Sequence, residues 1–420
     1  MGEKNNIPQI RFNNFDENWE VKEFKEIFSN LPNNTLSRAE LNYQTGLFKN
    51  VHYGDVLIKF GELLDVKNDR IPFISNDAMG NKFKLSKLQN GDIIIADTAE
   101  DESVGKCTEL INAENENVVS GLHTIPVRPI QHFASKYLGY YLNSSSYHDQ
   151  LLQLMQGIKV LSISKSALKS TVLVYPQEKL EQSQIGTYFQ NLDKLITLQQ
   201  QKHDKLVTLK KAMLDKMFPK EGADVPEIRF KGFTKVWEEK KIAELGDVVT
   251  GSTPSTQEPL YYSNIGIPWV TPTDILDNIT YHTAKYLSVK GQRVSRLVPK
   301  NTILVTSIAS IGKNTILGTL GSFNQQINGL IPDEKICDSY FLFTESVLWS
   351  NKMKRSAASG TMQIVNKTEF SELKTFIPTI AEQIEIGSYF QNLDKLISLH
   401  QQEIQKLKNI KKACLEKMFV

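Results

Sequence analysis

The chain has 420 residues, of which 40% are hydrophobic and 23% are charged, and its formal net charge at pH 7 is +2. This balance is typical of a soluble globular protein of two to four domains. No apolar run is long enough to span a membrane, and the first residues lack the apolar core of a signal peptide, so no membrane partner is expected.

The first predicted element is a globular domain over 1–177, which opens with a short segment, Ile-Pro-Gln-Ile-Arg-Phe, at 7–12. Runs rich in β-branched residues at 56–58, 93–95 and 172–174 are separated by Gly, Pro and Asn turns and predict strands. A short helix is predicted at 136–142. We therefore expect an α/β (α+β) domain built on a mixed sheet.

A conserved-looking helical spacer follows over 178–224. From Ile185 onward, apolar residues recur at spacings of three and four, which predicts a coiled-coil seam with a polar layer at its middle. Pro219 ends the helix. The predicted seam positions are Leu192, Leu195, Gln199, Leu206 and Leu209.

The second globular domain is predicted over 225–379. It opens with Val-Pro-Glu-Ile-Arg-Phe at 225–230, a close copy of the segment at 7–12. A strand is predicted at 303–305 and a helix at 340–348. Asn366 and Glu369 have the spacing of a capping box, which predicts the start of another helix. Gly312-Lys313 also repeats Gly105-Lys106, so the second domain is a diverged copy of the first.

The last predicted element is a second helical spacer over 380–420. Residues 386–419 repeat residues 185–218 almost letter for letter, whereas the two globular domains differ far more. The predicted seam positions here are Leu393, Leu396, His400, Leu407 and Ile410.

The near-identity of the two helices includes polar residues. Asn191 and Asp193 recur as Asn392 and Asp394. Core packing alone tolerates exchanges among apolar residues, so identical polar faces indicate that each helix docks the same kind of partner. A plain core bundle is the alternative reading. The two helices can pair in parallel, with both domains at one end, or antiparallel, with one domain at each end.

The sequence lacks the motifs of an active site. It has no phosphate-binding loop, dinucleotide fingerprint, zinc-protease motif or nucleophile elbow. Three isolated cysteines, Cys107, Cys337 and Cys414, argue against a zinc site or a disulfide framework and favour a reducing cytoplasm. The acids at 100–102 are read as a solvated turn, and His400 as a seam residue rather than a ligand. We expect no catalytic residue, metal or cofactor on this chain.

The domains instead offer polar loops rich in amides, hydroxyls and cations. Asn and Gln suit the reading of adenine, and Arg and Lys suit guanine or phosphate. Ordinary surface loops are the alternative reading for each. The candidate DNA contacts in the first domain are Lys82, Lys84, Lys106, His123, Lys159, Ser162 and Lys165. Those in the second domain are Thr253, Ser255, Lys313, Asn314, Asn324, Gln325, Gln326, Lys352, Arg355, Thr361 and Gln363.

Together these features resemble the specificity subunit of type I restriction–modification systems over the whole chain. The resemblance is carried by the Tyr-Phe-Gln-Asn-Leu-Asp-Lys-Leu-Ile starts of both helices, at Tyr188 and Tyr389, and by their Lys-Met-Phe endings. Further marks are the Glu-Gln pairs at 181–182 and 382–383. The segment before the first domain also repeats what lies between the first helix and the second domain, which matches the circular pseudo-twofold symmetry of that family.

The resemblance implies two target-recognition domains that each read one half of a bipartite, asymmetric double-stranded DNA target. It implies that the helices pair antiparallel and set the spacing between the two halves of the target. It also implies that they hold two modification subunits, through which restriction subunits join the complex. S-adenosylmethionine would then be bound by the modification subunits, and ATP and magnesium by the restriction subunits.

Two alternatives remain open. A standalone DNA-acting enzyme with a noncontiguous site would cleave or modify DNA without partners. A non-catalytic coiled-coil scaffold would have no affinity for DNA. The DNA target and the base contacts do not follow from residue types, because readout depends on the geometry of the loops.

Overall fold

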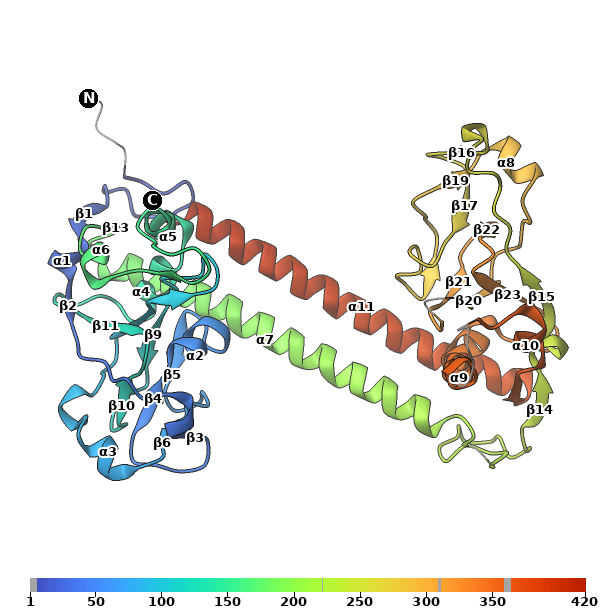
Figure 1. The fold of residues 1–420 in the computed structure, drawn as a ribbon, viewed down its shortest axis with the longest axis horizontal. Coiled ribbons are helices and arrows are strands. Elements are labelled where there is room, and N and C mark those ends of the chain that lie inside the picture. Colours follow the sequence, from blue (N-terminus) through green and yellow to red (C-terminus); the bar gives the residue numbers. More distant parts are fainter. Residues whose placement is uncertain (1–5, 221, 309–310, 359–363) are drawn as a thin grey trace. The chain divides into compact units, whose positions relative to one another are not determined.

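The structure is a computed structural model and describes residues 6–220, 222–308, 311–358 and 364–420 (Figure 1). The chain divides into two compact units, unit 1 (Met1–Gln199 and Gln402–Val420) and unit 2 (Gln200–Gln401). Each unit contains one globular domain and one half of each long helix. Among the described residues, the helices that are long enough to cross a membrane are too polar to do so.

Unit 1 is built on a five-stranded sheet with the strand order β2-β11-β7-β9-β5, in which all neighbours are antiparallel except β9 and β5. Its strands are β2 (Phe28–Asn30), β11 (Thr124–Pro129), β7 (Ile93–Ala96), β9 (Cys107–Ile111) and β5 (Leu63–Asp65). A four-stranded sheet comprises β10 (Val118–Ser120), β4 (Lys49–Val51), β6 (Phe73–Ile74) and β3 (Leu41–Asn42). Two small ladders pair β1 (Glu20–Glu23) with β13 (Val172–Tyr175) and β12 (Leu161–Ser162) with β8 (Thr98–Ala99).

The helices of unit 1 connect these strands. They are α1 (Phe24–Ile27), η1 (Arg38–Glu40), α2 (Tyr53–Ile58), α3 (Asp77–Asn81), η2 (Lys84–Ser86), α4 (Tyr137–Leu142), α5 (Ser145–Leu152), α6 (Lys165–Leu168) and the start of α7 (Lys179–Lys216).

Unit 2 repeats this topology. Its five-stranded sheet has the order β15 (Gly246–Thr250), β23 (Ile327–Pro332), β20 (Ile303–Thr306), β21 (Asn314–Leu317) and β18 (Ile279–Thr280). Again only the last pair is parallel. A second sheet comprises β16 (Tyr262–Ser263), β19 (Tyr286–Leu287), β17 (Ile267–Val270) and β22 (Ser322–Phe323), and a ladder pairs β14 (Glu238–Lys241) with β24 (Lys374–Ile377). The helices are η3 (Ile242–Glu244), η4 (Pro259–Tyr261), α8 (Val289–Arg293), α9 (Ser339–Ala358), α10 (Lys367–Glu372) and the start of α11 (Ile380–Lys417).

The repeated topology confirms the duplication predicted from sequence. The N–H of Gly105 donates to Ala96 O at 2.9 Å, and the N–H of Gly312 donates to Thr306 O at 3.2 Å, so the two Gly-Lys pairs occupy the same turn. The strands predicted at 93–95, 172–174 and 303–305 are present, as are α4 and the Asn366 capping box of α10.

One strand prediction is wrong, because residues 56–58 form the end of helix α2. A run of three apolar residues cannot distinguish a strand from one turn of helix. In the structure His52 caps the helix by accepting the N–H of Gly54 at 3.2 Å, Val56 is buried, and Ile58 points to solvent. The helix predicted at 340–348 is also longer than expected, since α9 begins at Ser339 and extends to Ala358.

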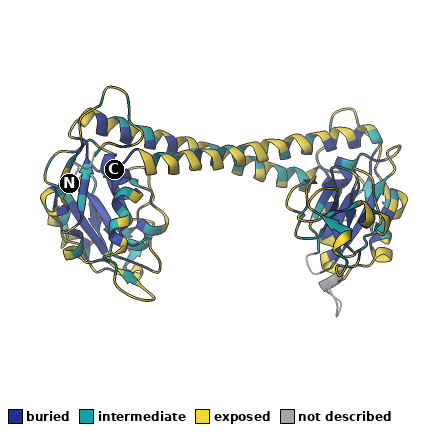
Figure 2. Ribbon diagram, turned by 90° about the horizontal axis from the view of Figure 1, so that it is seen from above, coloured by how far each residue is buried: buried dark blue, intermediate teal, exposed yellow. Residues whose placement is uncertain are grey.

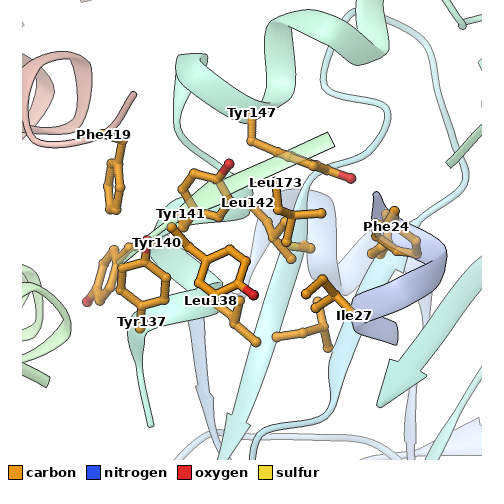
Figure 3. Close-up of a cluster of buried hydrophobic side chains, with 14 of the residues drawn as sticks. Phe24, Ile27, Tyr137, Leu138, Tyr140, Tyr141, Leu142, Tyr147, Leu173 and Phe419 are labelled. Atoms are coloured by element: carbon orange, nitrogen blue, oxygen red, sulfur yellow. The ribbon is translucent and has the colours of Figure 1, made fainter. Parts of the chain in front are cut away.

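The core of unit 1 joins the globular domain to the end of α11. Tyr137, Tyr141 and Phe189 surround Phe419, with ring centroids 5.4–6.0 Å apart; Figure 3 shows Phe419 approaching the tyrosines of α4. Burying aromatic side chains of this size is a main source of stability. In unit 2 the end of α7 has the same role, because Phe218 packs against Phe341 and Phe390.

The two long helices run antiparallel within each unit. In unit 1 the C-terminal part of α11 lies against the N-terminal part of α7, where Lys411 Nζ contacts Asp193 Oδ1 at 2.6 Å and Tyr140 donates to Asp193 Oδ2 at 2.6 Å. In unit 2 the roles of the helices are exchanged, because Lys210 of α7 contacts Asp394 of α11 at 2.5 Å. The antiparallel pairing implied by the family resemblance is therefore observed. The prediction that Asp193 and Asp394 belong to an outward polar face is wrong, because both residues form ion pairs between the two helices.

The register of the predicted seam is half right. Every seventh position (Leu192, Gln199, Leu206 and their copies Leu393, His400, Leu407) is buried or half-buried, but Leu195, Leu209, Leu396 and Ile410 are exposed. The buried and half-buried stripe of α7 comprises Ile185, Phe189, Leu192, Ile196, Gln199, His203, Leu206, Lys210 and Met213, and Met217 continues it just after the helix ends. The stripe of α11 comprises Ile386, Phe390, Leu393, Ile397, His400, Ile404, Leu407, Lys411 and Cys414, and Met418 continues it just after the helix ends. Figure 2 shows exposed residues along much of both helices.

The short segments that open each repeat join the two helices at their ends. Arg11 forms a two-point ion pair with Glu181 of α7, at 2.7 and 2.8 Å, and the N–H of Ile10 donates to Lys417 O of α11 at 2.9 Å. Arg229 pairs with Glu382 in the same way, at 2.6 and 2.7 Å. A planar guanidinium fits a carboxylate at two points, which explains why Arg and Glu recur together in both repeats.

Candidate nucleic-acid interface

The loops at one edge of the five-stranded sheet form equivalent surfaces in the two units. We define the rim of unit 1 as 31–36, 97–99 and 120–123, and the rim of unit 2 as 251–254, 307–308 and 324–326. In unit 1 the N–H of Asp97 donates to His123 O at 3.1 Å, and in unit 2 the N–H of Ser307 donates to Gln326 O at 2.8 Å. His123 and Gln326, two of the predicted contacts, therefore occupy the same position.

His123 is the centre of the rim in unit 1. Its Nδ1 lies 3.2 Å from Asp97 Oδ1, and its exposed ring meets Tyr53 edge-on at 5.3 Å. Burial raises the pKa of Asp97, while His123 and Lys165 act in the opposite direction. Ser162 pairs with Thr98 in the β12–β8 ladder, so the structure brings Ser162, Lys165 and His123 together around Asp97.

A group of aromatic and basic side chains adjoins this rim and was missed by the sequence analysis. Arg38 contacts Asp55 at 2.6 Å, and Lys59 contacts the same carboxylate at 2.9 Å. Lys59 and Arg70 also lie over the ring of Tyr43, at 4.6 and 4.9 Å from its centroid. Such stacked cations keep their charge exposed to an anionic ligand while their stems stay ordered.

His52 links this group to His123 through the ring of Tyr53. The centroids of His52 and Tyr53 are 4.7 Å apart. Burial, together with the charge of Arg38, lowers the pKa of His52 to about 4. His52 is therefore neutral at pH 7. Its unprotonated Nδ1 can then accept the hydrogen bond from Gly54 that caps α2.

The rim of unit 2 carries amides in place of the histidine. Thr253 donates to Gln325 Oε1, and Asn324 Nδ2 donates to Gln326 Oε1 at 3.0 Å. The structure thus brings four predicted residues together. Arg296, which was not predicted, joins them by donating to Thr250 O at 2.5 Å, and its backbone N–H donates to Ser252 Oγ at 2.9 Å. No local sequence signal identifies this arginine, because its partners are more than 40 residues away.

Several predicted contacts lie elsewhere or are engaged within the fold. Lys106 donates to Leu57 O at 2.8 Å, and burial lowers its pKa. Lys352 donates to Lys374 O at 2.7 Å, and Asn314 accepts from Ser350 at 2.9 Å. These three side chains form hydrogen bonds within the fold, and their contact with DNA stays a prediction.

The remaining predicted contacts are surface residues. Lys82 and Lys84 are exposed beside α3, and Arg355 is exposed on α9. Ser255 and Lys313 are exposed close in sequence to the rim of unit 2, where Lys313 donates weakly to Pro272 O at 3.3 Å. Lys159 is exposed on the turn that precedes β12. Thr361 and Gln363 lie outside the described residues.

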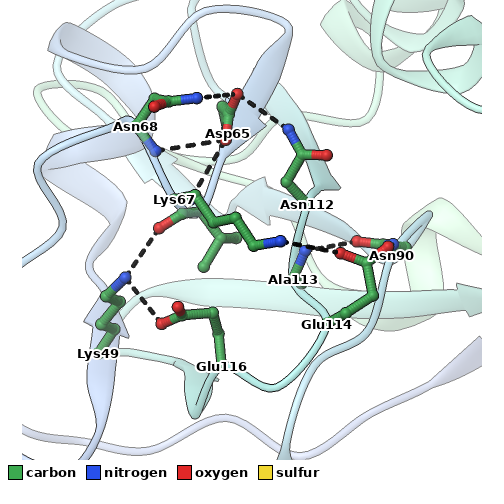
Figure 4. A network of polar contacts seen from close by, with 10 residues as sticks. Lys49, Asp65, Lys67, Asn68, Asn90, Asn112, Ala113, Glu114 and Glu116 are labelled. Atoms are coloured by element: carbon green, nitrogen blue, oxygen red, sulfur yellow. Dashed lines mark hydrogen bonds and ion pairs between the residues drawn. The ribbon is translucent and has the colours of Figure 1, made fainter.

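A neutralised polar network surrounds the turn between β9 and β10 in unit 1 (Figure 4). Lys49 donates to Val66 O at 2.8 Å and contacts Glu116 at 2.9 Å. Lys67 lies 3.8 Å from Glu114. Because each of these lysines faces a carboxylate, this part of the domain offers little unpaired positive charge.

Buried acids in the two units have structural partners. Glu109 accepts the backbone N–H groups of Lys136 and Gly139 at 2.5 and 2.9 Å, which closes the start of α4. Burial raises its pKa to about 7. Across the described residues, no group of three or more His, Cys, Asp or Glu side chains is placed to hold a metal ion.

Exposed apolar residues on the long helices form a second candidate surface. Leu195 and Leu198 on α7 are 46% exposed each, and their copies Leu396 and Leu399 on α11 are 45% and 50% exposed. Single exposed apolar residues are common, but the recurrence of this pair at the same helical positions in both repeats fits one kind of partner.

Comparisons with known proteins agree with this organisation. The family model "Type I restriction modification DNA specificity domain" matches residues 16–208 and again 234–409. The chain is 29% identical to the type I restriction enzyme MjaIX specificity subunit of Methanocaldococcus jannaschii, and the alignment spans only 44% of either chain, less than half the length of that relative. It is 20% identical to the putative MjaX specificity subunit of the same organism, over 97% of this chain and 94% of that one.

The fold has also been seen before. The S subunit of the type I restriction-modification system from M. genitalium superimposes with a TM-score of 0.64 at 14% identity, covering 99% of both chains. The two family matches together cover most of the sequence, one for each repeat. The chain therefore belongs to the type I restriction–modification DNA specificity family.

Proposed function

We propose that this chain is the sequence-reading subunit of a type I restriction–modification enzyme, and that each unit reads one half of a bipartite double-stranded DNA target. The supporting observation is the pair of equivalent rims that carry unlike residues. His123 in unit 1 and Gln326 in unit 2 occupy one position on a shared scaffold. Equivalent surfaces with different hydrogen-bonding groups suit the reading of two different sequences.

Charge and side-chain chemistry support DNA as the ligand of these rims. Asn324, Gln325 and Gln326 supply amides of the kind that read adenine, and Arg296 lies beside them. In unit 1, Arg38, Lys59 and Arg70 are placed to contact phosphates or bases. The net charge of +2 is small, so we expect binding to depend on these local groups rather than on a general basic surface.

The long helices would dock two modification subunits, one at each copy of the repeated apolar pair. Leu195 and Leu198 would contact one subunit, and Leu396 and Leu399 the other. The modification subunits would bind S-adenosylmethionine and methylate adenine, and restriction subunits that use ATP and magnesium would join through them. In this scheme the chain performs recognition and assembly in the cytoplasm and no chemistry of its own.

A binding experiment tests the proposal. Full-length chain with its modification subunits is titrated with duplex DNA over a salt series. Arg296→Ala is the variant, and Lys290→Ala on α8 is its control, because both residues are exposed. We expect affinity to fall steeply with salt, and Arg296→Ala to weaken binding by about tenfold. Binding that ignores both salt and Arg296 would contradict the proposal and favour a scaffold without DNA affinity. Cleavage or methylation of DNA by the chain alone would favour the standalone enzyme.

A further inference from the structure

The turn between α5 and β12 in unit 1 carries an isoleucine at its tip. Gln156 and Ser162 close the base of the turn with two backbone hydrogen bonds, of 2.9 and 2.8 Å. Ile158 at the tip is 99% exposed, and Val160 is exposed beside it. Lys159 between them is exposed as well. The turn therefore presents an apolar side chain flanked by a cation to whatever faces it.

The turn is fixed in shape and in position. Gly157 has a φ of +122°, and a Cβ at this residue would lie 2.0 Å from Val160 O, so only glycine fits. Thr98 donates to Leu161 O at 3.0 Å, and the N–H of Ile163 donates to Asp97 O at 2.9 Å. The base of the turn is thus attached to the same residue that holds His123.

Single exposed apolar residues are common and need no special cause. Ile158 differs from them because it lies at the tip of an anchored turn, closed by the β-bridge between Gln156 and Ser162, next to a surface that we propose to read DNA. Ile130, which is 64% exposed, follows the opposite end of β11 from His123 and offers a natural comparison.

The chemistry of the major groove identifies what Ile158 would touch. The groove admits a two-stranded ribbon, and the thymine methyl is the one apolar group that its base edges offer. Lys159 next to the tip would contact a phosphate and position the turn. We propose that Ile158 contacts a thymine methyl in the half-site that unit 1 reads, an inference that rests on the proposed function.

The test compares DNA with and without the methyl group. The target is first identified by mapping methylated adenines in cells that carry the wild-type chain. Duplexes of that target are then made with uracil replacing each thymine of the unit 1 half-site in turn. Affinity is measured for the full-length chain with its modification subunits, using wild type, Ile158→Ala and the more conservative Ile158→Val.

We expect uracil at one position to weaken wild-type binding by about fourfold, which corresponds to about 0.8 kcal/mol for one buried methyl group. Ile158→Ala should lose a similar factor on the thymine duplex and be insensitive to uracil, because the contact is already gone. Ile158→Val and the control Ile130→Ala should behave like wild type. Since Ile158 is exposed, all variants should fold normally, which circular dichroism can verify.

Three outcomes would overturn the inference: a wild type that is insensitive to uracil at every position, an Ile158→Ala variant that keeps its sensitivity, or a unit 1 half-site without an A·T pair. A separate control distinguishes failure of the proposed function from failure of the Ile158 inference. A wild-type complex that binds the mapped target no better than a scrambled duplex would refute DNA reading by this chain, and the role of Ile158 with it.

Discussion

Replacing Lys411 with methionine is expected to loosen the C-terminal part of α11 in unit 1. Lys411 is 15% exposed and contacts Glu62 at 2.8 Å and Asp193 at 2.6 Å. Burial acts to lower the pKa of Lys411, but the two carboxylates outweigh it and leave the pKa raised. Methionine is similar in size and removes the charge, so Glu62 and Asp193 would lose the cation that contacts them both, and only the neighbouring Lys106 would still act on Glu62.

The size of the effect follows from the burial of the three groups. Breaking a fully buried ion pair costs about 3–5 kcal/mol, and an exposed pair contributes about 0–1 kcal/mol. Glu62 and Asp193 are 20% and 35% exposed, so an intermediate cost of about 2 kcal/mol is expected. The neighbouring Lys412→Met is the matched control, because Lys412 is 80% exposed and lies 4.0 Å from Glu416.

Hydrogen exchange followed by mass spectrometry measures this effect locally. Amides in 402–417 of the Lys411→Met variant should exchange about 30-fold faster than in wild type, which corresponds to about 2 kcal/mol. Those of Lys412→Met should be nearly unchanged. Equal exchange in the two variants would refute the view that a buried charge cluster, rather than apolar packing alone, fixes the pairing of the helices.

Two further predictions concern stability and assembly. Burial raises the pKa of Glu345 to about 8, compared with about 4.5 in an unfolded chain, so its contribution to the stability of unit 2 is fully present below about pH 4.5 and is lost as pH rises through about 8. Glu345→Gln should flatten the loss of stability over this window in urea unfolding monitored by tryptophan fluorescence, and an unchanged slope would contradict this. Inserting one heptad into each long helix should lengthen the DNA spacer between the two half-sites and leave the half-site sequences intact. Methylation mapping would measure the spacer, and an unchanged spacer would count against the proposal that the helices set it.

The repeats in the sequence predicted most of the architecture. The near-identity of the two helices, the paired Arg and Glu residues and the Gly-Lys turns all reappear as equivalent contacts in both units. Repetition is informative because two copies under the same structural constraint keep the same residues, while copies that read different ligands diverge.

The seam register could not be predicted in full because both possible stripes contain apolar residues. Leu195 and Leu209 favour one stripe as the predicted seam, whereas His203 and Lys210 make the other stripe more polar. The structure uses the second stripe, since Lys210 finds Asp394 on the partner helix. A polar residue whose ion-pair partner lies on another helix cannot be recognised as buried from the sequence of its own helix.

The rims were predicted only in part for a related reason. His123, Gln325 and Gln326 could be found from residue type and loop position. Arg296 and Arg38 could not, because they reach the rims through contacts between segments that are distant in sequence. Lys352 and Asn314 are equally suitable by residue type, but the structure places them on α9 and β21, where both form hydrogen bonds within the fold.

Genome-wide mapping of methylated adenines can decide whether each unit reads its own half of one DNA target. Cells carrying the modification subunits would express wild type, His123→Ala or Gln326→Ala. If each unit reads its own half, we expect one bipartite motif for wild type, with His123→Ala relaxing one half alone and Gln326→Ala relaxing the other half alone. A motif that does not depend on this chain, or one in which either substitution alters both halves, would show that the units do not read separate halves.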